Sequence, residues 1–142
     1  MLLEELRSPI GKPYLLVYQP DHEPWVYADW TGYPTPTNVA TGALAYLNWM
    51  QKQGLHGVLN DNRHLVGRWD NSLDWLREIW LPHAAHCGLR YWAHLDNAGA
   101  MSAGSAAALR EVVNGQFKVE IFQEMGAAEE WLRAGLTRHR SA

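Results

Sequence analysis

The sequence predicts an α/β domain built on one mixed, mostly parallel sheet of five strands. Two observations predict it. Short runs rich in β-branched and aromatic residues alternate with longer segments in which apolar residues recur at three- and four-residue spacings. From the second strand onward one helical segment separates each strand from the next, and such strand–helix–strand units place their strands in parallel. The predicted order is therefore ββαβαβαβα.

The predicted strands are short segments with alternating or continuous apolar residues. They cover residues 14–19, 25–31, 56–61, 89–95 and 117–122. Only the turn-forming residues 20–24, with two prolines, separate the first two strands. We therefore expect an antiparallel hairpin there, with the first strand at an antiparallel edge and the other four in the mostly parallel part.

The predicted helices are the segments with helical apolar spacing. They cover residues 37–53, 70–88, about 102–115 and 127–133. Thr37 or Asn38 is the expected N-cap of the first helix, and Gly54 is its expected C′ residue. The second helix contains Pro82, which lacks a backbone donor, so this helix continues through the proline only with a kink or a restart.

Length and composition fit one globular domain of 142 residues, with 47% apolar and 19% charged residues. We expect a single domain over 1–142, with a core at about 14–133 and both termini loosely attached. The net charge of −3 supplies no basic field for a phosphate backbone, so nucleic acid is not an expected partner.

Three features indicate a cytoplasmic protein. Cys87 is the single cysteine and cannot form an internal disulfide. The first six residues carry two acids where a signal peptide carries basic residues. No apolar run approaches the roughly 20 residues that span a bilayer, so membrane insertion is not expected.

Four short segments, taken with the element order, resemble a known family. They are residues 28–32, 59–63, 80–82 and 122–132. They are similar to the STAS superfamily, the fold of anti-sigma-factor antagonists, and in particular to bacterial STAS-like proteins of this length. The resemblance covers about residues 14–131. It implies helices largely on one side of the sheet and a non-catalytic role in protein–protein switching, or ligand sensing in members likened to lipid carriers.

The resemblance also implies a candidate phosphoacceptor. In the antagonists the phosphorylated serine begins the helix after the third strand, about ten residues past an aspartate that ends this strand. Asp61 matches the aspartate and Ser72 the serine, but Leu73 stands where the family has a glycine. A phosphate on Ser72 would also lie beside Asp70 and Asp74, whose charges oppose it. We therefore expect Ser72 to be structural.

Polar residues follow the third predicted strand, at the rim where parallel sheets bind ligands. The candidate interaction rim comprises Asp61, Asn62, Arg63, His64, Trp69, Asp70 and Ser72. Two interpretations stay open. Arg63 can bind a small anionic or polar ligand as a bidentate donor, or it can pair with Asp61 in a hydrogen-bonded loop.

His83 and His86 lie three residues apart on a predicted helix, so they share a face and are candidate metal ligands. A zinc site needs one or two further ligands, from His64, His94 or Asp96, and none has a recognised spacing. We therefore predict no metal and no cofactor.

The leading hypothesis is a non-catalytic STAS-like regulatory or protein-interaction domain, because no coherent catalytic set accompanies the layout. The alternatives are a small-ligand or lipid-binding module and, third, a metal-dependent hydrolase that uses His83 and His86. The eight tryptophans either fill the core or form an exposed docking patch. An aromatic surface would also permit a homodimer.

Overall fold

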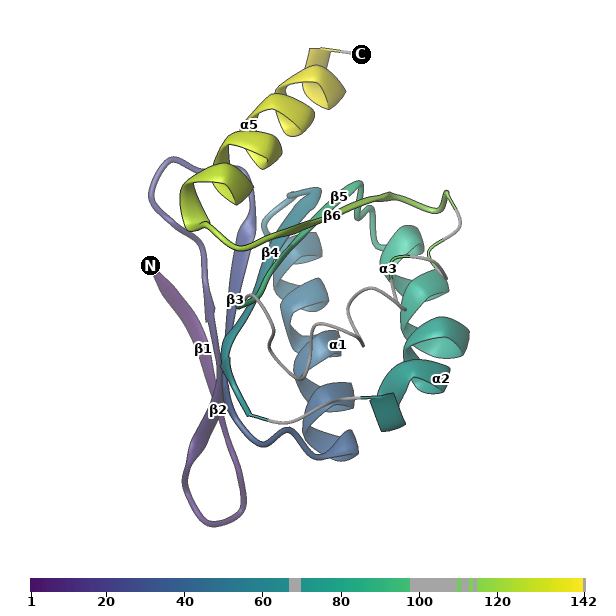
Figure 1. Cartoon of the computed structure of the whole chain (residues 1–142). Coiled ribbons are helices and arrows are strands. Elements are labelled where there is room, and N and C mark those ends of the chain that lie inside the picture. The colour runs from purple at the N-terminus through teal and green to yellow at the C-terminus, as the bar shows by residue number, and fades with distance from the viewer. Residues whose placement is uncertain (67–69, 98–109, 111–112, 114, 142) are drawn as a thin grey trace.

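The structure is a computed structural model, and it describes residues 1–66, 70–97, 110, 113 and 115–141. The predicted helix at 102–115 falls largely outside these residues, and Trp69 falls outside them entirely. Over the described part of the chain the fold is a mixed sheet with helices on both faces, as Figure 1 shows.

The described residues form one sheet of six strands in the order β1-β2-β3-β4-β5-β6. These strands are β1 (Leu2–Arg7), β2 (Pro13–Tyr18), β3 (Val26–Gly32), β4 (Gly57–Leu65), β5 (Tyr91–Leu95) and β6 (Lys118–Phe122). The pairs β1–β2 and β2–β3 are antiparallel, and the three pairs from β3 to β6 are parallel. The mixed, mostly parallel sheet predicted from the sequence is therefore confirmed, with its five strands as β2 to β6.

The sixth strand was not predicted. Residues 2–7 were expected to be loosely attached, but they pair with β2 as the edge strand β1. Leu3 and Leu6 pack against the core, and the amino group of Met1 donates to the carbonyl of Gln19 at 2.8 Å. Partial burial of the two leucines explains the attachment, because it adds apolar contact to the backbone ladder.

Helix α1 (Pro36–Lys52) crosses from β3 to β4. Thr35 is its N-cap and accepts a hydrogen bond from the Asn38 amide at 3.0 Å, while Pro36 occupies the first turn. The predicted caps, Thr37 and Asn38, are thus already inside the helix. Gly54 follows the helix with a φ of +68°, as its predicted C′ role requires.

The helical segment between β4 and β5 changes its winding along its length. A 3₁₀ turn (Asp70–Ser72) leads into α2 (Leu73–Trp75), a π-helical turn (Leu76–Trp80) and α3 (Leu81–His86). In the π turn the Leu81 amide donates to the Leu76 carbonyl five residues back. Because Pro82 cannot donate, this wide turn lets the segment restart there, in agreement with the expected restart.

The last helix, α5 (Met125–Ser141), is longer than the predicted 127–133 and packs on the opposite face of the sheet from α1, α2 and α3 (Figure 1). One core lies between the sheet and α1, α2 and α3, and a second lies between the sheet and α5. Adjacent β4 residues serve both cores, since Val58 belongs to the first and Leu59 to the second. No described helix is both long and apolar enough to cross a membrane.

Most of the described tryptophans belong to the core. Trp25, Trp30, Trp80 and Trp92 are buried, and Trp49, Trp75 and Trp131 are partly buried. For these seven residues the structure therefore favours the core interpretation over an exposed docking patch.

Candidate functional site

The candidate site lies on β3 and β4 rather than on a loop. Residues 61–64 were expected at a strand end, but β4 continues to Leu65 because β3 also continues and pairs with it as far as Gly32. Between the pairs Asp29–Asp61 and Thr31–His64, β3 advances by two residues and β4 by three. Strand β4 therefore contains a β-bulge, with one extra residue after Asp61.

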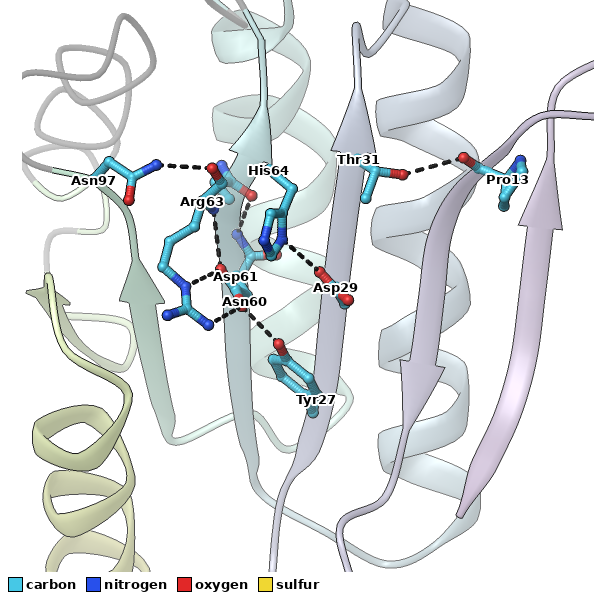
Figure 2. A network of polar contacts seen from close by, with 10 residues as sticks. Pro13, Tyr27, Asp29, Thr31, Asn60, Asp61, Arg63, His64 and Asn97 are labelled. Carbon is cyan, nitrogen blue, oxygen red and sulfur yellow. Dashed lines mark hydrogen bonds and ion pairs between the residues drawn. The ribbon is translucent and has the colours of Figure 1, made fainter.

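Three functional groups of β4, those of Asp61, Arg63 and His64, lie on one face of the sheet at the bulge. Before it the side chains alternate, so Asn60 faces α1 while Asp61 faces the other side of the sheet, here called the α5 face. After it both Arg63 and His64 reach the α5 face, where Arg63 contacts Asp61 and His64 contacts Asp29 (Figure 2). Adjacent residues of a regular strand point to opposite faces, so Arg63 and His64 share a face only because of the extra residue.

Asp61 is the centre of the network. Its carboxylate is fully buried and accepts from the Tyr27 hydroxyl at 2.6 Å, from the Arg63 amide at 3.0 Å, and from the Arg63 guanidinium through Nε and Nη2 at 3.0 Å each. Burial by itself raises the pKa of Asp61, but these donors outweigh it and hold the pKa below its ordinary value. Asp61 is therefore a buried, ionised and fully hydrogen-bonded carboxylate.

Asp29 lies across from Asp61 in a less favourable environment. Its Oδ1 is buried and lies 3.5 Å from His64 Nδ1, without a hydrogen bond from any described residue. Burial, and then the charge of Asp61, raise the pKa of Asp29. The two carboxylates thus differ. The ionised form of Asp61 is stabilised by its hydrogen bonds, and the ionised form of Asp29 is disfavoured by burial and by the charge of Asp61.

Asp29, Asp61 and His64 each offer a potential metal-ligating atom, and these atoms lie within 4.8 Å of one another. The donor set fits a metal poorly, because Tyr27 and Arg63 already occupy both oxygens of Asp61 and the guanidinium places a positive charge beside the site. The group is better described as an ion-pair network. Of the potential three-ligand groups in the described residues, none includes His83 or His86.

The other predicted rim residues are not brought together on one surface. Asn62 is buried and lines a pocket beside α1, and Ser72 is buried at 4% exposure. Asp70 lies in the 3₁₀ turn, and Trp69 is outside the described residues. Of the two interpretations of Arg63, the structure shows the pair with Asp61.

A second polar network lies on the α1 side of β4. The side-chain oxygen Oδ1 of Asn60 accepts from Trp30 Nε1 at 2.8 Å. The side-chain nitrogen Nδ2 of Asn60 lies 3.0 Å from Asn62 Oδ1 and 3.3 Å from His94 Nδ1. His94 Nε2 lies 3.3 Å from Asp96 Oδ2. If Asn60 donates to Nδ1, the Nε2 atom carries the proton and donates to Asp96, so every contact is satisfied and this buried network fixes the strand ends.

Sequence reasoning missed the roles of Tyr27, Asp29 and Asn60. A signal for the first two was present, because Tyr27 and Asp29 are two residues apart in a predicted strand and so share a face. Their meeting with Asp61 depends on the register of β3 against β4, for which the sequence contains no local signal.

The mixed sheet, with its antiparallel β1–β3 edge and its crossover helices, has the fold of an anti-sigma factor antagonist. A solved structure with this fold is an anti-sigma factor antagonist from Mycobacterium paratuberculosis. It superposes with a TM-score of 0.56 and 11% sequence identity over 90% of this chain and 99% of that one. No family model and no curated protein matches the sequence. At this identity the likeness concerns the fold.

Proposed function

We propose that this chain is a non-catalytic regulatory domain of the bacterial cytoplasm that acts by binding another protein. The observation that carries the proposal is the likeness of fold to an anti-sigma factor antagonist over 90% of the chain. By analogy with the name of that protein, the partner is a regulator of the anti-sigma-factor type.

The contact surface that we propose is the part of the α5 face around Arg63 and His64. Their side chains are 30% and 60% exposed, and both lie at the carboxyl ends of the parallel strands. Arg63 is held by Asp61, and its carbonyl accepts from the Asn97 side chain at 2.8 Å, which ties β4 to the residues after β5 (Figure 2). Such a fixed polar edge loses little side-chain entropy on binding.

Ser72 is proposed to be structural rather than a phosphoacceptor. Its burial supports this, because a kinase needs access to the hydroxyl. Phosphosite mapping of the protein from growing and stressed cells tests it, and substantial occupancy of Ser72 in either condition would refute the structural role.

The lipid-binding alternative is not supported by either of two pockets in the described residues. The pocket beside α1 has a volume of about 40 Å³, and the larger one, of about 260 Å³, has the charged residues Arg90 and Lys118 in its wall. Pockets for drug-sized or larger ligands usually measure roughly 300 Å³ or more. A second copy of this chain is the alternative partner. Light scattering of the purified protein at several concentrations distinguishes a homodimer from a monomer.

The binding experiment uses His64→Glu, with His86→Ala as the matched control, since His86 is an exposed histidine on α3, away from the network. Each tagged protein is expressed in its native cells, cross-linked and purified, and the partner is identified by mass spectrometry and titrated in pure form. We expect one partner shared by the wild type and His86→Ala, with at least tenfold weaker binding to His64→Glu. Equal binding by all three would exclude this surface, and a wild type without a specific partner would refute the function.

A further inference from the structure

A small pocket lies between α1, the π-helical turn and the sheet, on the opposite side of β4 from the Asp61 network. Aromatic and aliphatic side chains and two amides line it. The lining residues are Trp30, Tyr46, Trp80, Trp92, Asn60 and Asn62, with aliphatic residues completing the wall. The volume of about 40 Å³ leaves room for ordered water or for a molecule of a few non-hydrogen atoms.

Two hydrogen-bond donors in the pocket wall have no acceptor in the described part of the chain. Trp80 and Trp92 are buried, and neither indole N–H has a hydrogen-bond partner among the described residues. A buried donor left unpaired costs about 1–3 kcal/mol, and most buried polar groups in folded proteins are paired. Two such donors in contacting rings, with centroids 5.8 Å apart, therefore indicate a missing acceptor.

The Tyr46 hydroxyl is the third polar group of this cluster. Tyr46 is buried and meets the Trp80 ring edge-on at 6.4 Å between centroids. Burial raises the pKa of Tyr46, and the indole N–H groups of Trp92 and Trp80 partly oppose this rise. The three polar groups therefore belong to one cluster, and neither indole N–H makes a hydrogen bond to the phenol oxygen.

The neighbouring amides do not supply the missing acceptor. The Asn60 oxygen already accepts from Trp30, and the Asn62 oxygen accepts from Asn60. Among the described lining residues none is charged, so an ionic ligand would lack a counter-charge in the wall. The ring of His94, 5.2 Å from that of Trp92, also contacts the buried acid Asp96, whose charge opposes an anion.

We propose that this pocket binds a small uncharged molecule through an acceptor oxygen, such as an amide carbonyl, that meets the Tyr46 hydroxyl and the indole N–H groups of Trp80 and Trp92. This site is independent of the protein-binding surface around Arg63 and His64, because the two lie on opposite faces of β4. An experiment can therefore refute the ligand site without refuting the proposed protein-binding surface, and the reverse.

The test follows the indole Nε1–H signals of ¹⁵N-labelled protein during titration with N-methylacetamide, assigned with Trp80→Phe and Trp92→Phe. We expect saturable shifts of these two signals, and no saturable shift with acetate or tetramethylammonium. Tyr46→Phe should weaken N-methylacetamide binding at least fivefold. The matched control, Tyr18→Phe, replaces a tyrosine stacked on Tyr27 and should bind as the wild type does.

If Tyr46→Phe does not fold, Leu65→Phe replaces it, since this larger side chain enters the pocket from the end of β4 and should also weaken binding. No saturable shift with N-methylacetamide would show that the pocket holds only water and would overturn the proposal. Tighter binding of acetate or tetramethylammonium would overturn the assigned ligand class.

Discussion

Asp29 and Asp61 are directly opposite each other on β3 and β4, and their surroundings act on them in opposite directions. The donors around Asp61 hold its pKa down, so its ionised form stabilises the folded state. Burial and the charge of Asp61 raise the pKa of Asp29, so the ionised form of Asp29 destabilises it. Ionisation of Asp61 therefore raises the free energy of unfolding, whereas ionisation of Asp29 lowers it.

Asp29→Asn should stabilise the protein at pH 7, because it removes a carboxylate whose ionised form is disfavoured in the folded state. The raised pKa of Asp29 means that this penalty is present above the folded pKa and disappears as the pH falls toward the unfolded value of about 3.9. We expect a gain of about 1 kcal/mol at pH 7 and none near pH 3.5, measured by urea denaturation.

Asp21→Asn is the control for this substitution, since Asp21 is a largely exposed aspartate. It should change the free energy of unfolding little at either pH. A less stable Asp29→Asn at pH 7 would show that His64 and Arg63 compensate the charge of Asp29 fully.

Tyr27→Phe should destabilise the protein by about 1–2 kcal/mol at pH 7, since it removes the donor 2.6 Å from the buried Asp61 carboxylate. The lowered pKa of Asp61 contributes stability that is present above the unfolded value and lost as the pH falls through the folded value. Loss of one donor raises that folded pKa, so acid unfolding of the variant should begin at a higher pH.

Circular dichroism during acid titration measures this effect, with Tyr18→Phe as the control. The Tyr18 ring stacks on Tyr27 at 5.8 Å between centroids, so its substitution keeps the aromatic contact without touching Asp61. Equal acid midpoints for the two variants would contradict the role assigned to the Tyr27 hydroxyl.

At the scale of elements, two helices approach the sheet closely through glycines. A Cβ atom on Gly42 of α1 would lie 2.4 Å from the Trp30 ring, and one on Gly135 of α5 would lie 2.5 Å from the Tyr91 ring. Both distances are too short for any side chain, so the spacing between each helix and the sheet depends on the missing methyl group.

Gly135→Ala should therefore destabilise the protein by about 1–3 kcal/mol, the usual cost of overpacking. The gain in helix propensity, about 1 kcal/mol at most, does not offset it. Gly126→Ala in the same helix is the matched control, because its Cβ would meet no atom within 4 Å, and it should be neutral or slightly stabilising. Thermal unfolding of both variants measures the difference. Two equal melting temperatures would contradict the close packing of α5 on Tyr91.

The elements also show where sequence reasoning succeeds. The alternation in residues 25–31 predicts the strand that is observed as β3, and the helical spacing predicts α1 with Gly54 as its C′ residue. The bulge in β4 has no such signal. Residues 61–64 are all polar, a composition typical of a turn, and only their pairing with β3 makes them a strand.

At the scale of the whole molecule, the two cores share their central strands. Val58 and Leu59 are consecutive residues of β4 and lie in different cores. Loss of β4 would therefore expose apolar surface on both faces at once, so we expect each core to depend on the other. The single domain proposed from the sequence is consistent with this sharing.

We therefore expect one cooperative unfolding transition. Two probes report the two cores separately, namely the indole Nε1–H signals of Trp80, between the sheet and α1, and of Trp131, which is part of α5. Their urea midpoints should coincide. Earlier loss of the Trp131 signal would show that α5 unfolds independently and that the chain is not one cooperative unit.

Edge strand β1 and the full length of α5 could not be predicted from the sequence, for physical reasons. Residues 2–7 contain no β-branched residue and two acids, so their strand state depends on pairing with β2 rather than on propensity. Helix α5 extends to Ser141 through a polar stretch whose weak periodicity does not mark its end.

Strand β4 has a consequence for how this protein can change over generations. Asn60 and Asn62 belong to the pocket, whereas Asp61 and Arg63 belong to the α5 face, although these four residues are consecutive in the chain. Natural selection can therefore alter the surface seen by a partner at the odd positions and leave the pocket unchanged at the even ones. Loss of one codon between Asp61 and His64 would remove the bulge and one residue of the pocket or of the α5 face, Asn62 or Arg63, so descendants of this chain should vary here by substitution and not by deletion.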